Sequence, residues 1–196
     1  MVELEQAKRL IKLARDSISS YLLGEDVKDE NLKKEFSDIR GVFVTLNRDG
    51  ELRGCIGFPE GVYPLYEGII KAARSAAFSD PRFMPVEKEE LKDITIEISV
   101  LTKPIRIKAK KAEDYIKEVK VGRDGLIVRS GYGSGLLLPQ VATEYKWDSK
   151  VFLEQTCVKA GIDKDSWRDL GNCEVFRFQS QVFSEESPNG RVKRVL

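Results

Sequence analysis

The stretch GVFVTLNRDGELRGCIG, residues 41–57, decides the fold of this chain. Residues 41–46 form an apolar run rich in β-branched side chains, and residues 52–56 form a second candidate strand. The tetrapeptide NRDG at residues 47–50 is a strong turn signal, because Asp-Gly readily adopts the backbone of a two-residue hairpin turn. We therefore predict that the two segments pair as an antiparallel β-hairpin.

The second strand of this hairpin carries a cation and a thiol two positions apart. Side chains at i and i+2 of a strand project from the same face, so Arg53 and Cys55 are expected to share one side of the sheet. A fixed positive charge there favours the thiolate and lowers the pKa of the cysteine. Gly54 and Gly57 leave the backbone open to close approach. The alternative is a tight corner of the fold in which Cys55 packs as a small apolar side chain.

The rest of the chain predicts helices and further strands. Apolar residues recur at helical spacing over residues 4–22, and a second helix is expected from Pro64 to Phe78. Residues 94–100 alternate between apolar and polar side chains, which is typical of a half-buried strand, with Glu97 facing away from the core. Further short strands are expected at residues 119–121, 126–128, 136–138 and from 175, and helices at residues 140–145 and 150–160. This order indicates an α+β fold whose largely antiparallel β-sheet is flanked by helices.

Length and composition set the class of protein. The chain has 196 residues, of which 41% are hydrophobic and 33% charged, as in soluble globular proteins. We expect a single domain over residues 1–196, with room for a smaller subsidiary lobe, and a surface tail at residues 187–196. No apolar run approaches the length of a membrane span, and the N-terminus shows no secretory signal pattern. Cytoplasmic localisation is the default expectation.

Histidine is absent, which excludes several kinds of site. A Ser-His-Asp triad, a Cys-His dyad and imidazole-based metal sites cannot form within the chain. The three cysteines, Cys55, Cys157 and Cys173, form no CxxC pair and suit a reducing compartment with free thiols. We expect no bound metal, and the sequence identifies no cofactor.

The charge balance argues against a nucleic-acid or membrane-surface protein. The formal net charge is +1, and the basic end formed by Arg191, Lys193 and Arg194 lacks interleaved aromatic residues. An abundance of Lys and Glu is typical of thermophilic sources.

Three motifs together resemble one known family. They are LRGCIG at residues 52–57, AFSDPRF at 77–83, and LPQVA at 138–142 followed by Trp147-Asp148. Together they resemble the AMMECR-one domain family, and the chain is similar to its stand-alone prokaryotic members. The resemblance implies a two-lobed α+β protein with an antiparallel sheet and a cleft between a larger and a smaller part.

The resemblance also bears on function. The family has no settled biochemical activity, and its prokaryotic members are often encoded beside, or fused to, a Memo-like protein and a radical SAM protein. This implies a shared modification pathway, with those two proteins as candidate partners. It also carries a site role to Arg53, Cys55, Asp80 and Arg82 of this chain.

Cys55 and Asp80 are the candidate catalytic residues. A thiolate is nucleophilic where a thiol is nearly inert, but without histidine Cys55 depends on a neighbouring charge or an external base. Asp80 is either a general base, an orienter of Arg82, or a turn residue that ends the preceding helix. Whether this chain is an enzyme stays open at this point.

The candidate ligand-binding residues are Arg53, Arg82, Gly54 and Gly57. The two arginines suit a carboxylate or phosphate held bidentately, or else form structural ion pairs. Two functions follow: an enzyme or enzyme subunit acting on a small anionic or nucleotide-like substrate, or a non-catalytic module that binds a ligand or docks a partner. The oligomeric state cannot be inferred.

Overall fold

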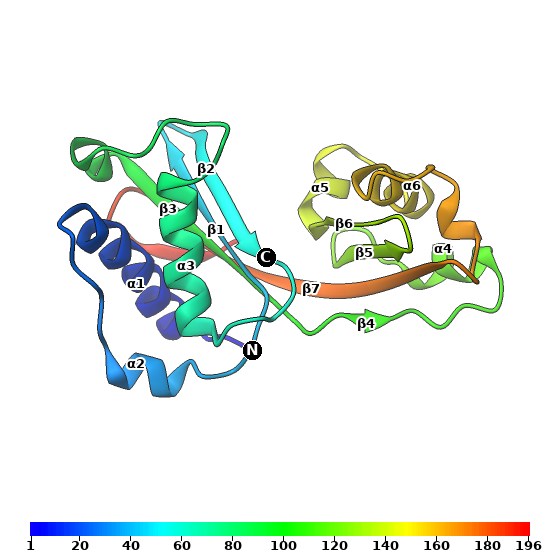
Figure 1. Ribbon diagram of the computed structural model, residues 1–196, viewed down its shortest axis with the longest axis horizontal. Helices are drawn as coiled ribbons and strands as arrows, with labels where there is room; N and C mark the ends of the chain where they lie inside the picture. The colour runs from blue at the N-terminus through cyan, green and yellow to red at the C-terminus, as the bar shows by residue number, and fades with distance from the viewer. The chain divides into compact units, whose positions relative to one another are not determined.

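A computed structural model describes residues 1–196 of the chain, with six α-helices, two short 3-10 helices and eight strands (Figure 1). The α-helices are α1 (Leu4–Leu22), α2 (Glu30–Glu35), α3 (Leu65–Phe78), α4 (Ala112–Glu118), α5 (Pro139–Glu144) and α6 (Ser149–Lys159). The 3-10 helices are η1 (Lys88–Lys92) and η2 (Ser166–Arg168). The strands are β1 (Val42–Arg48), β2 (Glu51–Phe58), β3 (Ile94–Leu101), β4 (Ile105–Arg106), β5 (Asp124–Ser130), β6 (Gly133–Leu137), β7 (Cys173–Glu185) and β8 (Val192–Arg194). Strand pairs such as β1–β2, β1–β3 and β5–β7 are antiparallel, which confirms the predicted α+β fold.

The chain divides into two compact units. Unit 1 contains residues 1–101 and 181–196, and unit 2 contains residues 102–180. Strand β7 passes from unit 2 into unit 1 at residue 181. The sequence predicted a single domain with a subsidiary lobe, and the cleft implied by the family resemblance stays a prediction.

Unit 1 is built on the predicted hairpin. Its strands are ordered β2-β1-β3-β7, and β8 pairs with the end of β7. Asp49 and Gly50 take the positive φ angles, 54° and 82°, that the two-residue turn between β1 and β2 requires. Strand β2 pairs only with β1 and is therefore an edge strand.

Helices α1 and α3 lie side by side and cover one face of the unit 1 sheet (Figure 1). The predicted helical spacing of residues 4–22 is confirmed, since Leu10, Ile11 and Ile18 are almost fully buried in the core. Along β1, Val42, Val44 and Leu46 face this core, while the intervening side chains lie on the opposite face. This second face carries the candidate site.

Unit 2 contains a smaller sheet, ordered β4-β7-β5-β6, packed with α4, α5 and α6. Its core includes Phe152, Leu153, Trp167 and Val175. Strands β5 and β6 form a hairpin whose turn lies at residues 131–132, and Gly133 and Gly135 lie in β6.

The structure differs from the sequence prediction at two places. Residues 119–121 form no strand, because Val119 is the residue that ends α4. Helix α4 is short and buries only Tyr115, so its sequence shows no repeated apolar spacing that would have predicted a helix. Residues 187–196 are not a surface tail, since they contain β8, whose Val192 is buried against the unit 1 core. Pairing with a strand and burial of one apolar side chain hold this segment.

No helix of the chain is long and apolar enough to cross a lipid bilayer.

Candidate functional site

A β-bulge in the hairpin determines the direction of the Cys55 side chain. Leu46 lies opposite Gly54 whereas Asn47 lies opposite Leu52, so Arg53 has no directly opposed partner in β1. A hairpin without this shift would place Cys55 opposite a residue on the core face. Because a one-residue shift moves side chains to the other face, the bulge sets Cys55 opposite Thr45, away from the core.

Cys55 is a half-buried neutral thiol. The Thr45 hydroxyl donates a hydrogen bond to Cys55 Sγ at 3.3 Å. Burial raises the pKa of Cys55 above its ordinary value, and the carboxylates of Asp80 and Glu97 act in the same direction. The Thr45 hydrogen bond and the Arg82 charge lower this pKa without reversing the shift. The thiol is therefore protonated at neutral pH.

Asp80 holds the edge of β2 with its carboxylate. Its Oδ2 accepts a hydrogen bond from the Cys55 backbone N–H at 2.9 Å, and its Oδ1 accepts from the Arg82 backbone N–H at 3.1 Å. The helix-ending segment after α3 thus satisfies a backbone donor that an edge strand leaves unpaired. The Asp80 side chain is 2% exposed. The short segment SDPR, residues 79–82, therefore closes the edge of the sheet at Cys55.

Arg82 completes this arrangement. Its Nε and Nη2 donate to the two oxygens of Asp80 at 2.9 and 2.7 Å, and Nη2 also reaches the Cys55 carbonyl oxygen at 3.3 Å. The bidentate pair holds the pKa of Asp80 far below its usual range, with the Cys55 N–H contributing. Both carboxylate oxygens are occupied, whereas the Arg82 side chain is 53% exposed. This geometry fits two of the sequence hypotheses, Asp80 as an orienter of Arg82 and Arg82 as half of a structural ion pair.

Arg53 is engaged with a residue that sequence reasoning missed. Its Nε and Nη2 donate to Oε1 and Oε2 of Glu90, both at 3.0 Å, and Arg48 Nη1 donates to the same carboxylate at 2.9 Å. The hydrogen bonds from Arg53 have the largest effect, and together with the bond from Arg48 they lower the pKa of Glu90 to about 2. The Arg53 charge is thus paired with Glu90, and the cation that lowers the pKa of Cys55 is Arg82.

A phenylalanine joins the two arginines. The guanidinium carbon of Arg82 lies 5.4 Å from the centroid of the Phe83 ring, and that of Arg53 lies 6.0 Å from it. Phe83 follows the DPR motif directly, so the sequence contained a signal for it. Glu90 had no such signal, because it reaches Arg53 only through the folding of the segment from α3 to η1.

The two glycines of the motif are needed for packing within unit 1. A Cβ at Gly54 would collide with the Ala76 carbonyl oxygen of α3, and a Cβ at Gly57 would collide with the Phe43 ring. The close approach expected at these positions is made by the protein's own atoms. The structure thus brings Arg53, Cys55, Asp80 and Arg82 to the edge of one strand, with Gly54 facing the helix behind it.

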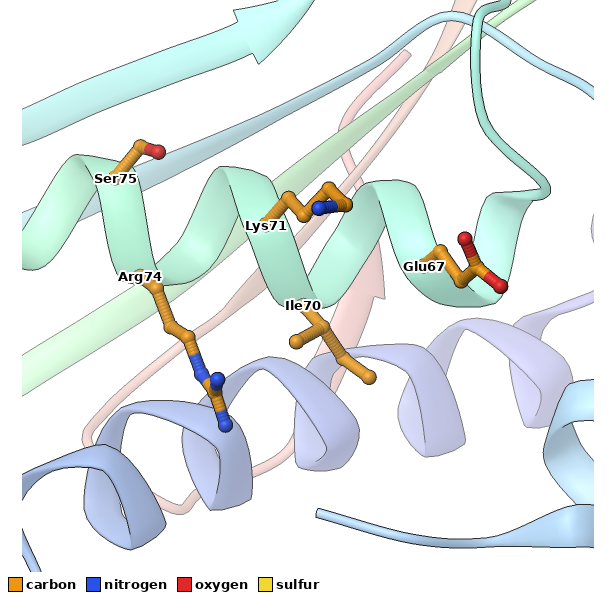
Figure 2. A pocket seen from close by; sticks show the side chains of 5 residues that line it. All are labelled: Glu67, Ile70, Lys71, Arg74 and Ser75. Carbon is orange, nitrogen blue, oxygen red and sulfur yellow. The ribbon is translucent and has the colours of Figure 1, made fainter. Parts of the chain in front are cut away.

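A separate hollow lies on the outer side of α3 (Figure 2). It has a volume of about 470 Å³ and is lined by Glu67, Ile70, Lys71, Arg74 and Ser75. Figure 2 shows Arg74 extending toward α1, where its Nε donates to the Ser17 carbonyl oxygen at 3.3 Å. None of the site residues predicted from the sequence lines this hollow.

No group of three or more Cys, Asp or Glu side chains is arranged to hold a metal ion. The site is instead made of two arginine–carboxylate pairs around a thiol.

Fold and site together define an α+β protein with a protected cysteine at the edge of an antiparallel sheet. The AMMECR1 family model matches residues 11–183. The chain belongs to this family, and the resemblance seen in its three motifs is confirmed.

The relatives have similar lengths. A protein of Methanocaldococcus jannaschii is 44% identical over 194 residues, covering 98% of this chain and 96% of its own. A protein of Thermococcus gammatolerans is 49% identical over 197 residues, covering 97% and 95%. The crystal structure of an uncharacterized protein from Pyrococcus horikoshii matches with a TM-score of 0.90 and 46% identity, over 98% of both chains. These relatives come from thermophilic archaea.

Proposed function

We propose that the chain is a binding module that holds a small anionic or nucleotide-like ligand at Arg82, beside the neutral thiol of Cys55. The observation that carries the proposal is the bidentate Asp80–Arg82 pair, which fixes a half-exposed guanidinium at the strand edge. The Arg82 side chain donates these hydrogen bonds through Nε and Nη2, so the two N–H groups of Nη1 are available to an anionic group.

The state of the two candidate catalytic residues favours binding over acid–base catalysis. A general base needs a free lone pair and a pKa near the working pH, whereas both Asp80 oxygens accept hydrogen bonds and its pKa is strongly lowered. Cys55 is protonated at neutral pH. The Phe83 ring lies within 6.0 Å of both guanidinium carbons and adds an aromatic group beside Arg82.

Calorimetric titration with adenosine monophosphate tests the proposal. We expect the Arg82→Lys variant to bind at least about tenfold more weakly, because lysine keeps the charge but loses the planar, bidentate geometry. Arg9 provides a matched control: it forms a bidentate pair with Glu35 and lies 5.7 Å from the Phe36 ring, on α1. Arg9→Lys should leave the affinity unchanged. Equal losses in both variants, or no binding by the wild type at millimolar nucleotide, would contradict the proposal.

One observation supports a second candidate function, an enzyme or enzyme subunit with Cys55 as nucleophile. The Thr45 hydroxyl donates to Cys55 Sγ, and such a bond stabilises a thiolate once it forms. The alkylation rate of Cys55, measured against pH with the modified residue read by mass spectrometry, separates the two functions. The binding module predicts an apparent pKa above about 8.5, and the nucleophile predicts one well below it. Cys55→Ser is the control for site assignment.

We further propose that this module works with a Memo-like and a radical SAM protein. The support is the family's motif pattern, which the chain carries at residues 52–57 and 77–83. Co-purification of the wild type and of Arg82→Lys with a Memo-like and a radical SAM protein encoded in the same genome tests this. A stable complex supports the proposal, and its absence for both partners contradicts it.

A further inference from the structure

A second hollow lies in unit 1, between α1 and the turn that leads into β8. Its volume is about 380 Å³. Its charged lining residues are Lys8, Lys12, Arg15, Asp16, Glu185 and Arg191. We call it the α1–β8 hollow. It brings the basic face of the first helix against Arg191, from the opposite end of the chain, and it is distinct from the site at Cys55.

The hollow is lined by more basic than acidic side chains. Four of its lining residues are basic and two are acidic. Glu185 is already neutralised, since its Oε2 accepts hydrogen bonds from Arg15 Nη2 and from the Ile96 backbone N–H, and its side chain is 4% exposed. Asp16 is therefore the remaining carboxylate among the residues that line the hollow with Lys8, Lys12 and Arg191.

These three cations are available to a ligand. Lys8 pairs with Glu5 and Lys12 with Asp16, each along α1 at 2.6 Å. Such exposed pairs between residues three or four apart contribute little stability, so a ligand displaces them at low cost. Arg191 is exposed and forms no ion pair.

The inner wall of the hollow combines apolar and polar groups. Ile11 and Val192 are buried and line it. Arg15 is 9% exposed, its Nη1 and Nη2 donate to the carbonyl oxygens of Leu91 and Ile94, and its Nε is buried without a hydrogen-bond partner. A buried unpaired donor is uncommon in proteins. The volume lies in the range of small-molecule sites.

We propose that the α1–β8 hollow binds the phosphoryl group of a small phosphomonoester, with Lys8, Lys12 and Arg191 around the oxyanion. A doubly charged phosphate matches three cations that line one hollow from two segments better than a singly charged carboxylate does. Ile11 and Val192 pack against the organic part of the ligand. Inorganic phosphate shares the oxyanion chemistry and lacks this organic part.

Titration of the full chain with glycerol phosphate and with inorganic phosphate, at low ionic strength, tests the proposal. Glycerol phosphate should bind, and Arg191→Ala and Lys12→Ala should each weaken it at least fivefold. Asp16→Asn should strengthen binding at least twofold, because it removes a lining carboxylate that pairs with Lys12 and repels the ligand. Tighter binding of glycerol phosphate than of inorganic phosphate identifies an ester as the ligand, and equal binding identifies the free anion.

Two controls separate this site from general attraction to positive charge. Lys193→Ala removes a cation of β8 near Arg191, but Lys193 pairs with Glu186 and does not line the hollow, so the affinity should not change. Repeating the titrations in the Arg82→Lys background weakens the anion site proposed beside Cys55, so that the loss caused by Arg191→Ala is assigned to the hollow. The proposal is overturned if Lys193→Ala weakens binding as much as Arg191→Ala, if Asp16→Asn has no effect, or if neither phosphate binds at millimolar concentration.

Discussion

Removing the Asp80 carboxylate should lower the unfolding free energy of unit 1 through two separate losses, the ion pair with Arg82 and the hydrogen bond from the Cys55 N–H. Asp80→Asn keeps an oxygen that accepts from the Cys55 N–H but loses the charge that pairs with Arg82. Breaking a fully buried ion pair costs about 3–5 kcal/mol, and the half-exposed Arg82 regains hydration, so we expect about 2 kcal/mol. Asp80→Ala also removes the acceptor of the Cys55 N–H, which adds about 1 kcal/mol.

Urea unfolding followed by far-ultraviolet circular dichroism measures both losses. Fluorescence is unsuitable, because Trp147 and Trp167 both lie in unit 2. Amide hydrogen exchange at Cys55 gives the local reading. A bond of about 1 kcal/mol corresponds to roughly fivefold faster exchange in Asp80→Ala than in Asp80→Asn.

The pH dependence of the same variants has a definite sign. The pKa of Asp80 is lowered in the folded state, so its contribution is complete above the unfolded value of about 3.9 and is lost as the pH falls through the folded value. The stability difference between the wild type and Asp80→Asn should therefore shrink below about pH 4. Unfolding free energies of both variants within about 0.5 kcal/mol of the wild type would refute the structural role of Asp80.

Two further predictions concern the surroundings of this site. Glu90→Gln should lower the unfolding free energy by about 2 kcal/mol at pH 7. Its difference from the wild type should disappear as the pH falls from about 4.3 through the folded pKa of about 2, which urea unfolding at several pH values measures. A difference that does not depend on pH would contradict the assignment. Gly54→Ala should lower the unfolding free energy by about 2 kcal/mol or more in thermal unfolding, because the new Cβ meets backbone atoms of α3 that cannot rotate away. In the matched control Gly131→Ala the new Cβ meets nothing within 4 Å, so its stability should stay within about 0.5 kcal/mol of the wild type. Equal effects of the two substitutions would contradict this account.

The hairpin of residues 42–58 shows which features of the structure can be predicted from local sequence and which cannot. Its turn at Asp49-Gly50 and its alternating apolar residues were readable, because turn chemistry and strand periodicity act over a few residues. The bulge at Arg53 was not readable. It reverses the face on which Cys55 lies relative to a regular two-residue hairpin, and it removes Arg53 from the alternation on which the thiolate hypothesis rested.

The motifs located the candidate site, but the roles of its residues depended on contacts between distant segments. Asp80 meets the Cys55 N–H across 25 positions, and Glu90 meets Arg53 across 37. Neither contact has a periodic or turn signal, since each forms only when α3 and the segment after it pack along β2. Thr45 was likewise missed, because its position opposite Cys55 depends on the bulge.

The sequence by itself determined the class of fold, the antiparallel hairpin, the long helices and the family, because these depend on periodicity, turn residues and short motifs within continuous segments. The tertiary structure alone decided that Arg53 is neutralised by Glu90, that Asp80 is engaged in closing a strand edge, and that Arg191 meets the first helix. It also showed that the C-terminal segment, which the sequence predicted to be a surface tail, contains β8. The physical reason is the same in each case: charge pairing, edge protection and strand addition join residues far apart in the chain, and their partners are fixed only when the core has formed.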